Sequence, residues 1–351
     1  MASSAALPPT HLAKLSPHPF LLANLSQPST KPTRANHRAP HEPRPLRINA
    51  SSLSHAHGSA MVRIGDTAVI CGVRGELLPV SSIPQWRTPK TALEREGMTE
   101  TDKKEEGTKE LRDYELLVPN IELATGCAPE FLPGVPPSTL AQTLSTRVYS
   151  LLHNSGMLDV EDLRVWHTPP NLEEGAAEDD RMEEDQDTAT TEPELKAYWT
   201  LYIDVLFISF DGNPFDAAWV AVLAALRDTK LPRAWWDADR EMVLCSRGES
   251  KPLALAGLPV ACTAAVLVER ETEPAVRDQI RGKTWMLVDP DREEEKLCDE
   301  TVTVVVDRSG GETRIKGIEK AGGRVLGPEE IRGVAALAEN RWADVSKELL
   351  S

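Results

Sequence analysis

One stretch of the sequence constrains the fold more than any other. Residues 197–210 (AYWTLYIDVLFISF) are rich in aromatic and β-branched side chains, which predicts a long strand. The strand ends at the turn signal Asp-Gly-Asn, residues 211–213, and Pro214 then opens an alanine-rich helix over residues 214–227. Proline suits the start of a helix because the amide it lacks would have no partner there. The chain must therefore build a sheet against which this helix packs.

Other elements flank this unit on both sides. Residues 60–64 and 67–73 are separated by Gly-Asp, which predicts a β-hairpin. Residues 138–153 have apolar side chains at helical spacing, with Ser138 as the cap. The remaining predicted elements are strands at 116–123, 260–268, 284–288 and 301–306, a turn at 309–311 that leads into residues 312–318, and an amphipathic C-terminal helix at 328–350. Strands with interleaved helices indicate an α+β fold in two lobes that divide near residue 235.

The charge of the chain is negative and unevenly placed. Acidic side chains outnumber basic ones by 55 to 39, a net charge of −16, which excludes a simple basic nucleic-acid binder. Residues 171–194 alone hold eleven acidic residues and one arginine, so we predict a disordered acidic loop there. Residues 88–115 mix both signs and predict a second loop. No apolar run approaches the ~20 residues of a membrane helix.

The N-terminal residues 1–41 contain no Asp or Glu. An acid-poor, serine-rich start is typical of an organelle transit peptide. Residues 19–25, however, are apolar enough to dock as an ordered arm. Composition alone leaves both interpretations open.

Few side chains outside these segments could carry chemistry. The five cysteines are odd in number and form no Cys-x-x-Cys pair, which favours free thiols in an intracellular protein over a zinc site or disulfides. His55 and His57 could share one face of a strand, but without a third ligand nearby a loop position is favoured. Asp204 lies in an apolar strand, where a structural hydrogen bond is favoured over catalysis. The carboxylates of residues 289–295 suit acid–base chemistry or a solvated turn, and the turn is favoured.

A series of short motifs carries more information than these single residues. Residues 49–73 contain an Asn, a run of small residues, Gly-Ser-Ala and Gly-Asp-Thr, and Arg34 and Arg38 precede them. Further motifs follow at 118–122, 202–205, 211–218, 258–263 and 287–295. In this order and spacing they resemble the RNase PH family, and within it the ring subunits of the eukaryotic RNA exosome. The resemblance covers residues 15–345, with the acidic run as an insertion.

The resemblance implies an RNase PH-like fold of two lobes, each a mixed sheet packed with helices. Residues 1–33 would form an N-terminal arm or helix, residues 34–235 the first lobe with the acidic insertion at about 171–194, and residues 236–351 the second lobe with the C-terminal helix. It also implies a hetero-oligomeric ring of RNase PH-like subunits, cap subunits with RNA-binding domains, and RNA in the central channel. The implied location is nucleus, nucleolus and cytoplasm, with no cofactor, no metal and no membrane.

The resemblance also locates a catalytic site that can be checked residue by residue. Active members cleave RNA with inorganic phosphate, held by a Thr and an Arg at the strand–turn–helix junction. At those positions this chain has Pro214 and Phe215, and Asp216 follows. Proline lacks a donor, phenylalanine cannot pair with phosphate, and an aspartate repels it. The family's second catalytic Asp is replaced by Glu295, six residues after Asp289. We therefore expect a degenerate phosphate site, a degenerate acid site and no catalytic residue.

Arg147 lies where the family has an arginine that contacts RNA or phosphate. It is expected either to contact RNA or to form a surface or interface salt bridge. The sequence thus predicts a non-catalytic structural subunit of the exosome core ring, which scaffolds the ring and lines its channel during 3′-to-5′ RNA processing and degradation, including ribosomal RNA maturation and mRNA turnover. Two alternatives stay open: an active phosphorolytic 3′-to-5′ exoribonuclease, and a standalone RNA-binding or organelle protein that borrowed the fold.

Overall fold

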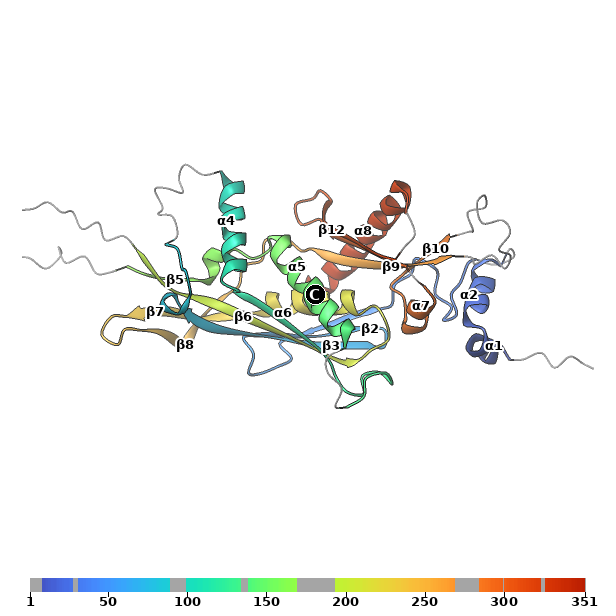
Figure 1. Cartoon of the computed structure of the whole chain (residues 1–351), viewed down its shortest axis with the longest axis horizontal. Coiled ribbons are helices and arrows are strands. Elements are labelled where there is room, and N and C mark those ends of the chain that lie inside the picture. The colour runs from blue at the N-terminus through green and yellow to red at the C-terminus, as the bar shows by residue number, and fades with distance from the viewer. Residues whose placement is uncertain are drawn as a thin grey trace, which may run out of the picture.

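The β structure consists of two sheets and a separate hairpin (Figure 1). The computed structural model describes residues 8–27, 31–88, 99–133, 138–168, 193–268, 284–298, 300–322 and 326–350. The first sheet has the order β1-β2-β3-β6-β4, and β5 also pairs with β6; its strands are β1 (Leu46–Ala50), β2 (Gly58–Ile64), β3 (Thr67–Pro79), β4 (Leu117–Leu123), β5 (Arg164–His167) and β6 (Glu194–Ser209). The second sheet has the order β10-β9-β11-β12, with β9 (Val260–Val268), β10 (Thr284–Val288), β11 (Glu300–Asp307) and β12 (Arg314–Ala321).

The hairpin and the helices complete the described chain. The hairpin joins β7 (Lys230–Asp237) to β8 (Met242–Pro252). The α-helices are α1 (Pro9–Leu15), α2 (Pro17–Leu25), α4 (Glu100–Asp113), α5 (Thr139–Ser155), α6 (Pro214–Asp228), α7 (Arg292–Leu297) and α8 (Pro328–Leu350). Single 3₁₀ turns occur at Val80–Ser82 and Val160–Leu163. This alternation of sheet and helix confirms the predicted α+β class.

Strand β6 organises the first sheet. It pairs antiparallel with β3 along most of its length, parallel with β4 near its C-terminal end, and antiparallel with β5 near its N-terminal end. Strands β2 and β3 form the predicted hairpin, whose turn places Gly65 at a φ of 57°. Positive φ is a conformation that glycine adopts at little cost. The long apolar strand and the hairpin were therefore predicted correctly.

Helix α6 forms the core between the two sheets. Its first thirteen residues, 214–226, are all buried, and it packs against β2 and β3 on one side and β9 on the other. The Trp219 indole donates to the Pro259 carbonyl oxygen over 2.7 Å. A Cβ on Gly58 of β2 would lie 2.5 Å from the Ala225 carbonyl oxygen, so this strand approaches the helix closely only because it has glycine there. The start of α6 is therefore held rigidly against both sheets.

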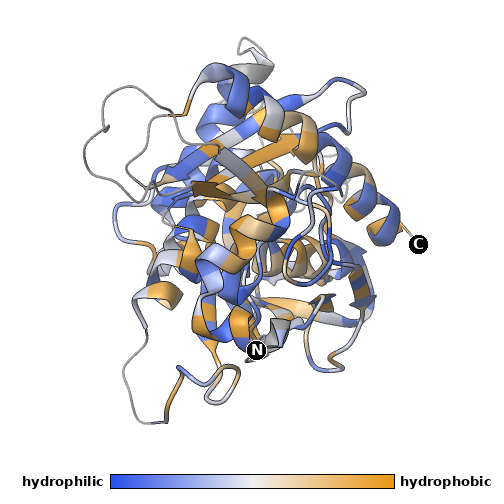
Figure 2. Ribbon diagram, turned by 90° about the vertical axis from the view of Figure 1, so that its right-hand side faces the viewer, coloured by the Kyte–Doolittle hydropathy of each residue, from blue (hydrophilic) through white to orange (hydrophobic). Residues whose placement is uncertain are grey.

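The chain ends pack onto the second sheet. Helix α8 crosses β9 and β11 and buries Val334, Ala338 and Val345. All three lie on the apolar face predicted for this helix, which comprises Ile331, Val334, Leu337, Ala338, Trp342, Val345 and Leu349. Helix α2 buries Leu21 and Leu25 against β9 and β10, so the ordered-arm interpretation holds for residues 17–25. Seen from the α2 end, hydrophobic stretches gather in the interior strands and the inward sides of the helices (Figure 2).

Two helices occupy stretches for which we predicted loops. Helix α4 lies within residues 88–115, and the Thr99 hydroxyl caps it by accepting from the Asp102 amide. It has almost no apolar residues; it docks through Leu111, which is buried, and through Glu110, which pairs with Arg164. Helix α7 begins within 289–295, where a capping box built on Asp291 starts a helix in place of the expected solvated turn. Strands β1, β5, β7 and β8 were not predicted.

The remaining expectations concern cysteines, membranes and the acidic run. None of the five cysteines forms a disulfide; four are buried, whereas Cys245 on β8 is exposed. None of the described helices is long and apolar enough to cross a membrane. Residues 171–192 of the predicted acidic loop lie outside the described residues, and Glu194 already belongs to β6.

Candidate functional site

The candidate site surrounds the loop that joins β6 to α6, residues 211–213. Gly212 has a φ of 77°, and a Cβ on it would lie 2.4 Å from the Asp291 carbonyl carbon, so only glycine fits this crossing. Thr67 on β3 fixes the loop: its hydroxyl accepts from the Asp211 amide and donates to the Gly212 carbonyl oxygen, both over 3.0 Å. The loop is thereby locked against both the first sheet and the β10–α7 connection.

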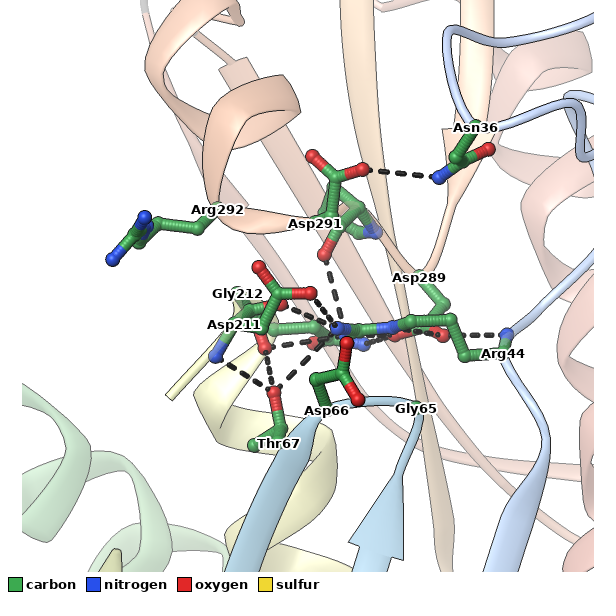
Figure 3. Close-up of polar contacts among 12 residues, drawn as sticks. Asn36, Arg44, Gly65, Asp66, Thr67, Asp211, Gly212, Asp289, Asp291 and Arg292 are labelled. Carbon is green, nitrogen blue, oxygen red and sulfur yellow. Dashed lines mark hydrogen bonds and ion pairs between the residues drawn. The ribbon is translucent and has the colours of Figure 1, made fainter. Parts of the chain in front are cut away.

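Arg44 fills the centre of the site (Figure 3). Its backbone amide donates to Asp289 Oδ2 over 2.7 Å, and its guanidinium contacts both carboxylate oxygens, Nε to Oδ2 over 3.0 Å and Nη2 to Oδ1 over 2.8 Å. The same guanidinium also donates to the carbonyl oxygens of Asp211 and Gly212. Paired contacts of this kind are the strongest arginine–carboxylate interactions. Arg44 therefore ties the N-terminal segment to the start of α6 and to the end of β10.

Asp289 is 1% exposed and is held as a carboxylate. Burial by itself raises the pKa of Asp289, but the hydrogen bonds and the charge of Arg44 outweigh burial and hold this pKa below its ordinary value. Asn213 adds a hydrogen bond from Nδ2 to Asp289 Oδ1 over 2.8 Å. An ion that is paired this completely is poorly placed to exchange a proton with a substrate.

Two further arginines surround the same connection. Arg34 is 0% exposed, and its Nη1 donates to Glu294 Oε2 over 3.0 Å. Arg38 lies 3.5 Å from Glu294 Oε2 and 3.8 Å from Asp289 Oδ2. These are the arginines of the Arg-x-x-x-Arg motif noted in the sequence. Both of them hold the start of α7 in place.

The predicted phosphate position is filled by side chains of the chain itself. Pro214 and Phe215 open α6, and both are buried. Asp216 is 2% exposed and accepts three hydrogen bonds: from the Thr263 amide over 2.9 Å, from the Thr263 hydroxyl over 2.7 Å and from Asn213 Nδ2 over 2.9 Å. Burial raises the pKa of Asp216, although these hydrogen bonds oppose the rise. Asp216 therefore ties the start of α6 to Thr263 on β9 and to the side chain of Asn213.

Glu295, at the second acid position, also contacts this helix start. Its Oε1 accepts from the Asn213 amide over 2.7 Å. Burial is the main cause that raises the pKa of Glu295 to about 7, and the nearby charges of Asp289 and Asp291 add to the rise. The carboxyl group thus points at the helix start that precedes Pro214 instead of standing free as a proton donor.

Arg147 on α5 lies beside this site, and its contacts are internal. Its guanidinium carbon lies 3.8 Å from the centre of the Phe215 ring, a cation–π contact. Its Nη2 donates to the Thr303 hydroxyl over 3.0 Å and its Nε donates to Glu319 on β12. Thr303 in turn shares a hydrogen bond of 2.9 Å with Thr263. The structure thus places Arg147 on the Phe215 ring and connects it to Asp216 through Thr303 and Thr263.

The other candidate residues lie outside this site. Asp204 accepts from Asn120 Nδ2 over 3.2 Å, which fits the expected structural hydrogen bond. His57 Nδ1 accepts from the Gly75 amide over 2.9 Å, and burial lowers the pKa of His57. Within the described residues no group of three His, Cys, Asp or Glu side chains could hold a metal ion.

Sequence reasoning missed Arg44, Asn213, Thr263 and Thr303 as members of the site. They come from a loop, a helix cap and two separate strands, so no local spacing connects them. A signal existed only for Asn213, which occupies a left-handed conformation (φ 48°) at the helix start, a conformation in which asparagine is enriched.

The fold is a two-lobed α+β fold, and two carboxylates of the chain, Asp216 and Glu295, form hydrogen bonds at the start of α6. Residues 42–232 match the model of the 3′ exoribonuclease family, domain 1, and residues 257–341 match domain 2 of that family. The chain therefore belongs to the RNase PH 3′ exoribonuclease family.

Named relatives agree with this assignment. The exosome complex component rrp43 of Schizosaccharomyces pombe is 27% identical over 95% of both chains. The exosome complex component Rrp42 of Methanopyrus kandleri is 28% identical over 76% of this chain and 73% of its own. The predicted resemblance to ring subunits of the RNA exosome is thereby confirmed.

Solved structures support the fold. An Archaeoglobus fulgidus exosome with RNA bound to the active site contains a chain with a TM-score of 0.63 and 23% identity, covering 96% of this chain and 99% of its own. A chain of an archaeal exosome core gives a TM-score of 0.59 and 21% identity, covering 98% of this chain and 100% of its own. The predicted RNase PH-like fold is confirmed.

Proposed function

We propose that this chain is a structural subunit of the RNA exosome core ring and has no catalytic activity of its own. The ring role in RNA processing rests on relatives that are named exosome components, one of which matches over 95% of both chains. In the ring the chain would contact other RNase PH-like subunits and cap subunits and would line a channel that carries RNA. We further propose that the complex works in the nucleus, nucleolus and cytoplasm.

One observation carries the proposed inactivity: the start of α6 is occupied by carboxylates of the chain. Asp216 accepts from Thr263 and Asn213, and Glu295 accepts from the Asn213 amide. A phosphate ion entering here would meet these carboxylates in a buried setting. Like charges 4 Å apart repel by about 4 kcal/mol at an effective dielectric of 20. Pro214 and Phe215 offer no cation and no amide hydrogen at the first helical position to offset that repulsion.

Arg147 remains the residue we propose for contact with RNA. Its side chain is 27% exposed, while Thr303 and Glu319 hold its inner atoms. Any RNA phosphate would approach the exposed part of the guanidinium. Replacement Arg147→Ala in the assembled ring should weaken cross-linking of RNA to this chain, whereas the control Glu319→Gln should preserve it. Equal loss from both variants would mean that the arginine acts only as a tether between α5 and β12.

The test of the ring role is the native mass and composition of the tagged protein purified from its own cells. Several RNase PH-like chains in one complex support the ring role, and a monomer or homo-oligomer refutes it. The test of inactivity is incubation of the purified chain with single-stranded RNA and inorganic phosphate. No release of nucleoside diphosphates is expected; phosphate-dependent release would establish the alternative, an active phosphorolytic exoribonuclease.

A further inference from the structure

Helix α8 carries a buried arginine on the face that packs against the second sheet. Arg341 is 5% exposed and lies among the buried residues of this helix, which include Val334, Ala338 and Val345. Val334 and Ala338 belong to the same apolar cluster as Cys262 of β9. Because a guanidinium stays protonated in proteins, a full positive charge is held here in apolar surroundings.

This arginine differs from the other buried arginines of the described chain in having no counter-ion. Four arginines are buried there, and three of them pair with carboxylates: Arg34 with Glu294, Arg44 with Asp289, and Arg164 with Glu110 and Glu161. No ion pair joins Arg341 to any residue that the structure describes, and its buried Nη2 has no hydrogen-bond partner. A buried charge that lacks a partner is strongly destabilising.

Asp289 is an acidic group close enough to feel the charge of Arg341. Burial by itself raises the pKa of Asp289, and Arg44 and then Arg341 lower it. Both oxygens of this carboxylate are already occupied, however. Oδ2 accepts from the amide and from Nε of Arg44, and Oδ1 accepts from Nη2 of Arg44 and from Asn213. Asp289 is thus not the partner of Arg341, and the partner comes from outside the described chain.

Size and charge limit what this partner can be. Arg341 is almost covered, and it lines neither the cavity beside β5 and β7 nor the cavity beside α4, so a large ligand has no route to it. Burial raises the pKa of the Cys262 thiol more than the charge of Arg341 lowers it, so this thiol is neutral and supplies no anion. One uncompensated positive charge is matched by one negative charge, whereas a divalent anion leaves an excess buried beside Asp289.

We propose that Arg341 binds a chloride ion between helix α8 and the second sheet. The ion lies against the guanidinium and supplies the negative charge that no described residue supplies. The attachment of α8 to β9 therefore depends on a small anion, whereas Arg34, Arg44 and Arg164 are held by carboxylates of the chain. The inference does not depend on the proposed ring function or on the residues at the start of α6.

Thermal unfolding of the purified full chain tests the proposal, with sodium chloride compared with sodium gluconate at the same ionic strength. Gluconate is also monovalent but is too large for a nearly closed site. The parent chain should melt about 3 °C or more higher in chloride, because a ligand that binds only the folded state stabilises it. Equal melting temperatures of the parent chain in the two salts would refute chloride binding.

A pair of variants assigns the effect to Arg341. Arg341→Met keeps an apolar side chain on the buried face and removes the charge, so it should melt at the same temperature in both salts. Arg332→Met removes an exposed arginine of the same helix and should keep the chloride response of the parent chain. Far-ultraviolet circular dichroism establishes that both variants fold. A chloride response that survives in Arg341→Met would place the ion elsewhere and overturn the assignment.

Bromide locates the ion without any substitution, because it resembles chloride and scatters X-rays anomalously. In crystals of the protein soaked in sodium bromide, we expect an anomalous peak within hydrogen-bond reach of the Arg341 guanidinium. Bromide peaks at other places with none at Arg341 would contradict the proposal. A carboxylate of another chain in contact with Arg341 would overturn it as well, since the counter-ion would then be a protein side chain.

Discussion

The candidate site around Asp289 and the β7–β8 hairpin differ in how far their side chains find partners within the chain. At the loop, three buried or nearly buried arginines are matched by Asp289 and Glu294, and the donors at the start of α6 are taken by internal carboxylates. At the hairpin, a strand edge and apolar side chains remain without partners in the described chain. The charged groups of the loop are thus satisfied within the chain, whereas large apolar side chains of the hairpin face the solvent.

The largest expected effect comes from breaking the buried ion pair. Arg44→Leu leaves Asp289 buried without its main partner, and such a loss costs about 3–5 kcal/mol of unfolding free energy. Urea denaturation measures it. The control Arg63→Leu removes an arginine whose side chain is 58% exposed, and should change stability by less than about 0.5 kcal/mol. A loss below about 1 kcal/mol for Arg44→Leu would show that the pair does not organise the loop.

The next effect concerns the backbone crossing at Gly212. Gly212→Ala places a Cβ 2.4 Å from the Asp291 backbone at a φ of 77°, so we expect a loss of about 3 kcal/mol in unfolding free energy. Gly310→Ala is the matched control, because nothing lies within 4 Å of its added Cβ. Thermal unfolding of the two variants compares them directly. Equal melting temperatures would contradict the tight crossing.

Periodic and turn signals explain what the sequence predicted in the fold. The long strand β6, the β2–β3 hairpin, α5, α6 and α8 all bury one face or a whole segment, so their apolar spacing is visible locally. Helix α4 was missed because it is polar on nearly every face and depends on Leu111 and the Glu110–Arg164 ion pair to dock. Strands β7 and β8 were missed because neither is half-buried with regular alternation.

The site was predictable only where a family motif marked it. Pro214, Phe215, Asp216, Asp289, Glu295 and Arg147 were named from the resemblance, and the structure brings them to the start of α6 or its immediate surroundings. Arg44 and Thr263 could not be named, because their roles depend on contacts across more than forty residues of sequence. Long-range side-chain pairing has no signature within a local window.

A smaller effect is the pH dependence of stability, which differs between Glu295 and Asp289. With a pKa raised to about 7, Glu295 stabilises the fold while protonated, and that stability is lost as the pH rises through the interval from about 4.5 to 7. Asp289, whose pKa is lowered, contributes stability above its unfolded pKa and loses it only as the pH falls below about 4. The two carboxyl groups therefore act in separate pH ranges and in opposite directions.

Glu295→Gln isolates the first of these contributions. Its amide oxygen can still accept from the Asn213 amide, but it cannot ionise. At pH 8 the variant should be more stable than the parent chain by on the order of 2 kcal/mol, and at pH 4 the two should be equal. Urea denaturation across this pH range measures the difference. If the difference in unfolding free energy between the variant and the parent chain is the same at every pH, Glu295 is not buried as a carboxylate.

The smallest change in unfolding free energy is expected at the β7–β8 hairpin, where an exposed tryptophan can be compared with a buried one. Trp235 is 43% exposed in the free chain, so Trp235→Ala should change the unfolding free energy by no more than about 0.5 kcal/mol. Trp219→Ala, at a fully buried tryptophan of α6, should cost about 3–5 kcal/mol and serves as the reference. Urea denaturation of both variants measures the two values. A large loss from Trp235→Ala would mean that this indole packs within the fold, whereas a negligible loss would confirm that the fold does not depend on it.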